Sequence, residues 1–281
     1  MVRITPTSHD GLAALELVDR GTRMVIVHAV GPRIAAFGSA HANSLLFWDR
    51  AHVHTRGAWR LYGGHRLWIT RPDADESEEA YAPDNEPCRV RELERGVAIT
   101  APPSASCIER TIAVHGHPTG WMVEHRLRNV GDMLWSGGAW ALTCTLPSRG
   151  TRYRVPLDGG SSRWNILTMV VPRQWGGEHT SPLVDSQFRL TEDALLFQAR
   201  GREAKRMLGT PRGRLEMSDP SRGAFAKFAV PIKGARYPLN TNVAVYLGPK
   251  AFMVELETMS PLMTLAPGQT LRHVEFWRHL P

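Results

Sequence analysis

Cysteine is scarce in this chain of 281 residues, which contains only Cys88, Cys107 and Cys144. These three residues are odd in number, lie far apart and do not have the spacing of zinc ligands. A disulfide framework is therefore not expected, and buried free thiols are the expected state. Free thiols fit a reducing compartment.

Long apolar runs are also lacking. The first ten residues contain no charged segment followed by an apolar one. No stretch approaches the roughly 20 apolar residues that are needed to span a bilayer. The sequence therefore predicts a cytoplasmic protein with no membrane partner.

Lysine is rare, although the formal net charge is +7 at pH 7. The arginines are dispersed, whereas proteins that bind nucleic acid usually gather their basic residues in one motif or on one face. We therefore expect no nucleic-acid partner, but the charge is compatible with an anionic sugar. Lys205 or Lys227 could contact a phosphate or carboxylate, although lysine side chains are usually exposed.

No stretch has a long helical pattern. Short runs rich in Val, Ile and Leu alternate with glycine and proline turn signals instead, which is typical of strands. Many strands in one domain need two stacked sheets or a closed barrel to bury their apolar faces. The sequence predicts an all-β antiparallel fold, and the lack of a linker or repeat predicts one domain over residues 1–281. The expected strands include Leu12 to Val18, Arg23 to Val30, Arg33 to Phe37, Gly96 to Ala101, Trp121 to Arg128, Met133 to Leu146, Arg163 to Val171, Ala194 to Arg200, Phe225 to Val230 and Leu271 to Trp277.

The most informative segment lies near the C-terminal end. Alternation along Ala251 to Thr258 puts Glu255 and Glu257 on one face of a strand. The apolar run Val243 to Leu247 precedes it, and Gly248-Pro249 predicts a turn between the two, so we expect a hairpin. Carboxylates on a rigid sheet suit a site that binds a ligand rich in hydroxyl groups. A sugar is the first candidate.

A second informative segment, Tyr62 to Trp68, contains two glycines followed by His65 and Arg66. On a strand these two side chains point in opposite directions, unless a bulge at Gly64 re-aims one of them. At most one of them is therefore expected to face a ligand. The alternative is a glycine bulge in which Arg66 pairs with an acidic residue and His65 caps a loop.

Other polar and aromatic residues have two interpretations. The polar segment Arg71 to Pro87 is long for a loop, and its end places Asp84 and Asn85 where they could form the rim of a site. Trp140 could stack on a sugar ring or fill the core of a sandwich. Both interpretations stay open on the sequence alone.

The histidines do not predict a metal site. His52 and His54 form one pair at alternate positions and His115 and His117 form another, but neither pair has a carboxylate at a recognised ligand spacing. We expect these histidines at the surface, and we expect neither metal nor cofactor. His125 shares a strand face with apolar residues, which favours a hydrogen-bonded histidine in the core.

Several segments together resemble an uncharacterised family of galactose-mutarotase-like proteins in the aldose 1-epimerase superfamily. The similarity runs from about Tyr62 to Trp277 and implies a β-supersandwich whose concave face, in aldose 1-epimerases, holds a sugar. The segments are Tyr62-Gly63-Gly64-His65-Arg66-Leu67-Trp68, Tyr81-Ala82-Pro83-Asp84-Asn85, Ala139-Trp140-Ala141-Leu142-Thr143, Tyr237-Pro238 with Asn240 and Asn242, Val254-Glu255-Leu256-Glu257-Thr258 and Pro267-Gly268.

The resemblance also implies chemical roles. In aldose 1-epimerases a glutamate on a late strand removes the anomeric hydroxyl proton, and a histidine protonates the ring oxygen. Glu255, three residues before Thr258, is similar to that base. The region Gly138 to Leu146, which resembles the strand that precedes the histidine in the epimerases, contains Trp140 and no histidine. Another residue must therefore supply the acid if the reaction is the same.

These observations lead to a functional hypothesis. We expect a carbohydrate-active protein, an aldose 1-epimerase-like enzyme with Glu255 as base and either His65 or Glu257 as acid, because repulsion between neighbouring carboxylates raises one pKa. The alternatives are a carbohydrate-binding protein without turnover, and an acid/base isomerase or lyase acting on a non-sugar metabolite. The sequence indicates neither the substrate nor the oligomeric state. The expected substrate-binding residues are Arg66, Asp84, Asn85, Trp140, Tyr237, Asn240 and Asn242.

Overall fold

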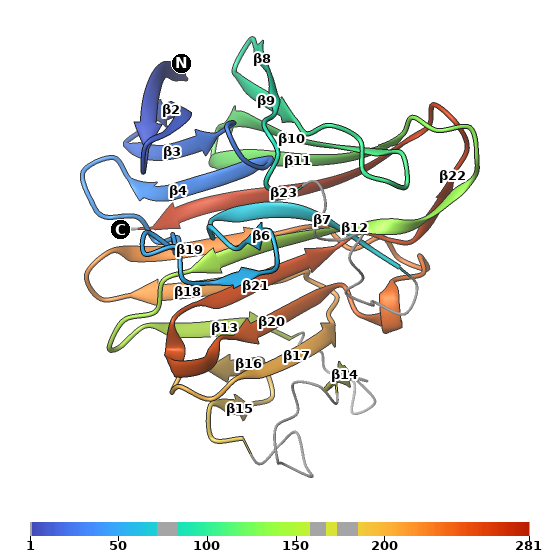
Figure 1. Cartoon of the computed structure of the whole chain (residues 1–281). Coiled ribbons are helices and arrows are strands. Elements are labelled where there is room, and N and C mark those ends of the chain that lie inside the picture. The colour runs from blue at the N-terminus through green and yellow to red at the C-terminus, as the bar shows by residue number, and fades with distance from the viewer. Residues whose placement is uncertain (1, 72–83, 158–166, 173–184, 281) are drawn as a thin grey trace.

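Two large antiparallel sheets make up most of the computed structural model, which describes residues 2–71, 84–157, 167–172 and 185–280. Figure 1 shows their strands running roughly alongside one another, with β23 between β11 and β19. The described residues contain no α-helix, only two short 3-10 turns, η2 (Pro238–Asn240) and η3 (Pro249–Ala251). Within this part of the chain, no helix has the length and apolar character required to cross a membrane.

The first sheet has eleven strands and carries the cavity described below. Its order is β1-β2-β3-β4-β7-β12-β21-β20-β17-β14, with β22 paired to one end of β12. Strands from both halves of the sequence therefore meet at its centre. The strands are β1 (Arg3–His9), β2 (Leu12–Asp19), β3 (Thr22–Val27), β4 (Arg33–Ser39), β7 (His65–Thr70), β12 (Trp135–Thr145), β14 (Thr168–Val170), β17 (Ala204–Gly209), β20 (Val243–Leu247), β21 (Val254–Met259) and β22 (Met263–Leu265).

The second sheet has ten strands in the order β15-β16-β13-β18-β19-β23-β11-β10-β9-β8. A separate two-stranded hairpin is formed by β5 (Thr55–Arg56) and β6 (Trp59–Arg60). The strands of the second sheet are β8 (Arg89–Leu93), β9 (Gly96–Thr100), β10 (Ile108–His117), β11 (Gly120–Asn129), β13 (Arg152–Pro156), β15 (Phe188–Leu190), β16 (Ala194–Phe197), β18 (Arg214–Asp219), β19 (Gly223–Phe228) and β23 (Thr270–Leu280).

The largest hydrophobic cluster contains buried side chains from both sheets, so each sheet turns one apolar face toward the other. Phe37 of the first sheet packs edge-on against Phe225 and Trp277 of the second, with ring centroids 5.2 and 5.4 Å apart. Strand β21 illustrates the alternation, because Val254 and Leu256 join this core. The intervening glutamates therefore point to the other side of the sheet.

The structure confirms the predicted all-β antiparallel fold and the hairpin near the C-terminal end. β20 and β21 pair antiparallel with Val245 opposite Leu256, and η3 follows Gly248 in the turn between them. The basic segment around Lys205, which the sequence did not identify as a strand, forms β17. Lys205 and Lys227 are 1% and 0% exposed, so of the two interpretations the contact with a carboxylate holds and the exposed side chain does not. Each lies beside a buried carboxylate, Glu257 for the first and Glu275 for the second.

Candidate functional site

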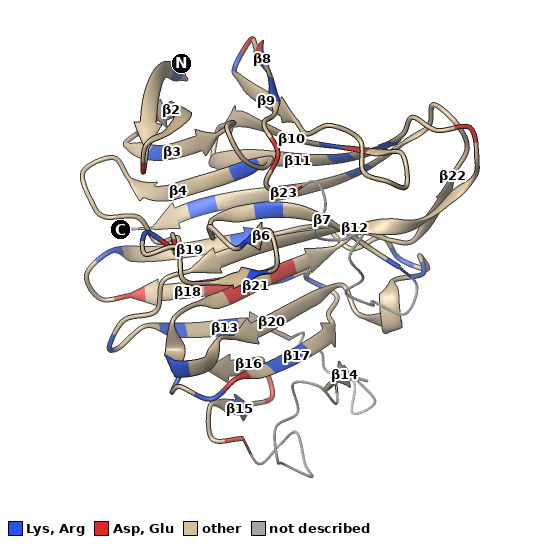
Figure 2. Ribbon diagram, viewed as in Figure 1, with Lys and Arg blue, Asp and Glu red and all other residues tan. Residues whose placement is uncertain are grey.

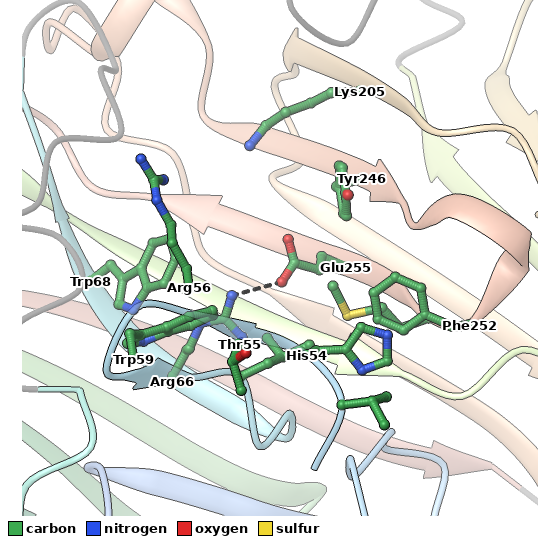
Figure 3. A pocket seen from close by; sticks show the side chains of 13 residues that line it. His54, Thr55, Arg56, Trp59, Arg66, Trp68, Lys205, Tyr246, Phe252 and Glu255 are labelled. Atoms are coloured by element: carbon green, nitrogen blue, oxygen red, sulfur yellow. Dashed lines mark hydrogen bonds and ion pairs between the residues drawn. The ribbon is translucent and has the colours of Figure 1, made fainter. Parts of the chain in front are cut away.

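A cavity of about 420 Å³ lies on the face of the first sheet that points away from the apolar core. Figure 3 shows its lining, which comes from β7, β17, β20, β21 and the β5–β6 hairpin with the segment before it. The lining combines charged groups with several aromatic rings, a composition that suits a polar ligand with an apolar face. The lining residues are Val53, His54, Thr55, Arg56, Trp59, Leu61, Arg66, Trp68, Lys205, Tyr246, Phe252, Met253 and Glu255.

Glu255 is the carboxylate of this cavity. Arg66 donates from Nη2 to its Oε1 over 2.9 Å, and the Cys144 thiol donates to the same oxygen over 3.3 Å. In Figure 3 the other carboxylate oxygen points into the open space. Burial raises the pKa of Cys144, so this residue stays a thiol and can donate. The result is a carboxylate fixed by one oxygen and presented to a ligand by the other.

Arg66 itself is almost completely buried, and its partners keep it charged. Burial acts to lower its pKa, but the neighbouring Cys144, Glu255 and Asp84 outweigh that effect, and the pKa is raised above its usual value. The guanidinium also lies 4.4 Å from the centroid of the Trp68 ring, a cation–π contact. The ion pair with Glu255 and the contact with the Trp68 ring together fix the orientation of this arginine.

Aromatic rings form two walls of the cavity. Trp59 lies against Trp68 with ring centroids 6.1 Å apart and planes at 63°. On another side, His54 stacks on Phe252 with centroids 4.0 Å apart and planes at 15°. The faces of such rings can pack against the C–H groups of a sugar ring.

Asp84 and Asn85 hold the hairpin that forms one wall. Asp84 accepts from Trp59 Nε1 over 2.9 Å, and it pairs with buried Arg33 over 3.1 Å. The Asn85 side chain accepts from the Arg60 backbone N–H over 2.6 Å and donates to its carbonyl over 2.9 Å. The two predicted rim residues therefore lie behind the hairpin and position it, without lining the cavity. Tyr81 to Pro83, which belong to the same segment of the family resemblance, lie outside the described residues.

His54 lines the cavity, although the sequence indicated only a surface histidine. Its Nδ1 lies 3.1 Å from the carboxylate of Asp49, which also accepts from the His54 backbone N–H over 2.9 Å. Asp49 is only 4% exposed, and its carboxylate lies beside the imidazole without a hydrogen bond to Nδ1. No spacing in the sequence indicated that His54 and Glu255 would share a cavity, because they lie about two hundred residues apart.

Glu257 shares a face with Glu255, as the alternation predicted, but it is 0% exposed. Its Oε2 accepts from Trp140 Nε1 over 2.7 Å and lies 3.4 Å from Lys205 Nζ. The ammonium of Lys205 is 4.5 Å from the centroid of the Trp140 ring. Trp140 is thus a buried support for this ion pair, and its ring does not line the cavity.

His65 points away from the cavity and into the interior. β7 pairs in regular register with β12, His65 opposite Thr143, so no bulge re-aims its side chain. Its Nδ1 lies 2.9 Å from Thr143 Oγ1 and its Nε2 lies 2.7 Å from His125 Nε2. Because His65 and Arg66 alternate on one strand, only Arg66 can reach a ligand beside Glu255. Burial also lowers the pKa of His65 well below its ordinary value.

The interior around His65 contains further titratable residues. His125 is completely buried, as predicted, and its Nδ1 donates to the carbonyl of His273 over 3.0 Å. Glu275 pairs with Lys227 over 2.8 Å. Potential metal-ligand atoms of His65, His125 and Glu275 lie within 4.8 Å of one another. The imidazole pair and the ion pair already use those atoms, so this cluster has the contacts of a buried polar network.

Three predicted substrate-binding residues lie elsewhere in the fold. Tyr237 and Asn242 line a second cavity of about 220 Å³ that does not include Glu255. Asn242 accepts from the backbone N–H of Thr210 and donates to its carbonyl, each over 2.8 Å, and the Tyr237 hydroxyl accepts from the N–H of Ile232 over 2.9 Å. Asn240 is exposed in η2. These contacts organise loops and do not contribute to the first cavity.

Comparison with solved structures identifies the architecture. A candidate aldose 1-epimerase from Escherichia coli K12 superposes with a TM-score of 0.62 at 12% sequence identity, covering 99% of each chain. A galactose mutarotase-like protein from Clostridium acetobutylicum gives 0.59 at 9% identity, again over 99% of each chain. The chain has the galactose mutarotase-like fold. No protein-family model and no curated protein matches the sequence.

A third galactose mutarotase-like protein, from Lactobacillus casei, gives a TM-score of 0.57 at 12% identity over 94% of this chain and 99% of that one. The resemblance noted in the sequence is therefore confirmed as a galactose mutarotase-like fold. Figure 2 shows acidic residues on β21 and basic residues on β7 and β17, two strands that lie on either side of β21 in the sheet order.

Proposed function

We propose that the cavity binds a sugar and interconverts its anomers by acid/base catalysis, as an aldose 1-epimerase does. The observation that supports this most is Glu255, a carboxylate held by Arg66 through one oxygen while the other faces an aromatic-walled cavity. The galactose mutarotase-like fold and the named similarities to epimerase-like proteins agree with a carbohydrate ligand.

Anomer interconversion needs a base near the O1 hydroxyl and an acid near the ring oxygen O5. In the proposed reaction, Glu255 removes the O1 proton while O5 receives one, so the C1–O5 bond breaks and O1 becomes a carbonyl oxygen. Rotation about the C1–C2 bond presents the other carbonyl face, and the reverse proton transfers close the ring. Arg66 keeps the carboxylate in place throughout.

We assign the acid to His54 in place of His65, because His54 lines the cavity and His65 does not. The ring stacks on Phe252 with its Nδ1 side 3.1 Å from the Asp49 carboxylate, and in the protonated imidazole we assign proton donation to Nε2. Trp59 and Phe252 would pack against the apolar face of the sugar.

A second candidate is a carbohydrate-binding protein without turnover. The Arg66–Glu255 ion pair favours it, because Arg66 already occupies one oxygen of the carboxylate and holds it in place. The same pair offers donors and an acceptor to neighbouring sugar hydroxyls. Only the enzyme would accelerate the interconversion of anomers, so a measurement of turnover distinguishes the two candidates.

The deciding experiment is proton NMR of freshly dissolved α-aldoses, neutral and anionic, with and without the protein. If the proposal is right, one or more sugars will reach anomeric equilibrium faster with the protein. Glu255→Gln should lower this rate about 100-fold or more, and His54→Gln should lower it by a similar factor. Glu94→Gln, a change at an exposed site in the turn between β8 and β9, should leave it unchanged.

Line broadening without acceleration would favour the binding protein. An active Glu255→Gln variant would contradict the assignment of the base, and an active His54→Gln variant would contradict that of the acid. No effect on any sugar would contradict a carbohydrate function altogether and would favour a non-sugar metabolite.

A further inference from the structure

The side chains that line the cavity differ between its two sides. Figure 3 shows His54 and Phe252 on one side of Glu255, whereas Trp68 and Arg56 lie on the other. On the first side, the imidazole of His54 stacks on the Phe252 ring with centroids 4.0 Å apart. The ring that we assign as the acid therefore lies directly against apolar surface.

This apolar surface continues into a packed hydrophobic cluster. Leu61 and Met253 belong to the cluster, and Phe252 packs against it. Leu61 and Met253 are each 4% exposed, and both line the cavity. Val53, the residue before His54, also lines the cavity and is 67% exposed. We call Val53, Leu61, Phe252 and Met253 the apolar wall, because none of these side chains can donate a hydrogen bond.

The proposed reaction determines which part of a sugar meets the apolar wall. Glu255 takes the proton of the O1 hydroxyl, and His54 delivers a proton to the ring oxygen O5. In an aldopyranose O5 is bonded to C5, and C5 carries the C6 group outside the ring. The C6 group therefore lies beside His54 and against the apolar side chains around it.

A hydroxymethyl group and a methyl group at C5 would interact differently with the apolar wall. The hydroxyl of a hydroxymethyl group would be removed from water and would gain no partner from these side chains, which is unfavourable. A methyl group in the same place would bury apolar surface without losing a hydrogen bond. The apolar wall thus favours a methyl group.

We propose that the cavity takes a 6-deoxyaldose, a sugar with a methyl group at C5, and that this methyl group packs against the apolar wall. The inference rests on the proposed epimerase function, in which His54 acts at O5, and adds the substrate class. Val53 is the exposed member of the wall, and Met253 is a buried member that lies two residues before Glu255.

Calorimetric titration of the whole protein with matched sugars tests the inference without depending on turnover. Each pair shares one ring and differs only in the hydroxyl on C6. The pairs are D-glucose with 6-deoxy-D-glucose, D-galactose with 6-deoxy-D-galactose, L-galactose with 6-deoxy-L-galactose, and L-mannose with 6-deoxy-L-mannose. We expect at least one 6-deoxyaldose to bind about tenfold or more tightly than its hydroxylated parent.

Two variants supply the residue-level test. Met253→Gln keeps a similar length and adds an amide that can bind the C6 hydroxyl, so the preference for the 6-deoxyaldose should fall about tenfold. Val53→Thr adds a hydroxyl at an exposed position, which tolerates the change without unfolding, and the preference should fall about threefold. Val90→Thr, the same change at an exposed position of β8 on the other sheet, is the matched control and should leave the preference unchanged.

The outcomes separate this inference from the proposed function. Equal or tighter binding of the hydroxylated parents, or a 6-deoxy preference that survives both variants, would overturn the inference and leave the sugar function standing. Binding of D-xylose as tightly as 6-deoxy-D-glucose would also overturn it, because xylose has the same ring and no methyl group. A 6-deoxy preference without faster interconversion of anomers would support the apolar contact and contradict the enzyme. Failure of every sugar to bind would overturn both.

Discussion

Charged side chains in the interior are stabilised by pairing with a side chain of opposite charge. Lys227 and Glu275 are both 0% exposed, and their Nζ and Oε1 atoms lie 2.8 Å apart. Trp277 Nε1 donates to the other carboxylate oxygen over 2.6 Å. Burial acts to raise the pKa of Glu275, but the ammonium of Lys227 outweighs it, so the pKa lies well below its usual value. Glu275 is therefore ionised, and its buried charge is stabilised by Lys227.

Lys227→Met should therefore destabilise the protein by about 3–5 kcal/mol, because it leaves a buried carboxylate without its cation. Urea unfolding followed by tryptophan fluorescence measures the loss. Lys233→Met, at an exposed position, should stay within about 0.5 kcal/mol of the parent protein. The double variant Lys227→Met, Glu275→Leu should recover part of the loss. Equal unfolding midpoints for the two lysine variants would refute the interpretation.

Among the elements, the turn that leads into β7 positions Arg66. Gly64 has φ +69°, a left-handed conformation, and a Cβ there would overlap the carbonyl oxygen of Ile34 on β4. Its N–H donates to the Phe47 carbonyl and its carbonyl accepts from Cys144 N–H, each over 2.8 Å. This close approach between strands is the physical reason for a glycine here.

Gly64→Ala should be much more destabilising than Gly234→Ala. Gly234 also has a positive φ, +77°, but a Cβ there would meet nothing within 4 Å. Both variants introduce strain in φ, and only the first forces strands apart, so we expect a difference of at least about 2 kcal/mol in the free energy of unfolding. Urea titration compares them directly. If the two variants lose the same stability, then the backbone approach at Gly64 is not what requires glycine.

In the whole molecule, the space between the sheets holds a continuous polar network. Lys227 donates to Thr143, whose hydroxyl can donate to His65 Nδ1. His65 Nε2 can then donate to His125 Nε2, because His125 Nδ1 donates to the carbonyl of His273. This order of donors satisfies each group with His65 and His125 neutral. A proton added to His65 or His125 would break this order of hydrogen bonds. Both imidazoles therefore stay neutral while the two sheets are packed together.

Stability should accordingly fall as the pH is lowered. Burial lowers the pKa values of His65 and His125 and lowers that of His273 to about 3, from an ordinary value of 6.5. Below pH 6.5 the unfolded chain therefore binds more protons than the folded protein does. The free energy of unfolding that these histidines contribute above that pH is lost as the pH falls. With three such sites, the free energy of unfolding should be up to about 4 kcal/mol lower near pH 5.5 than near pH 7.5.

Urea unfolding at the two pH values, with circular dichroism as the signal, tests this. The exposed His41 serves as a comparison, because His41→Gln should leave the pH dependence unchanged. A free energy of unfolding that is the same at both pH values would show that the buried histidines are already charged in the folded protein.

Much of this arrangement follows from the alternation of side chains along strands, which is local and can be predicted from the sequence. It predicted the antiparallel strands, the hairpin of β20 and β21, a common face for Glu255 and Glu257, and opposite directions for His65 and Arg66. The reason is that successive side chains on any strand point to opposite sides, whatever the strand packs against.

Only the tertiary structure decided which of those sides faces a cavity and which partners meet there. His54 and Glu255 share a cavity, Asp84 and Asn85 support a hairpin from behind, and Lys205 is buried beside Glu257. These placements depend on contacts between residues far apart in the chain. Alternation gives the relative direction of neighbouring side chains, whereas burial and pairing depend on how whole sheets pack against each other.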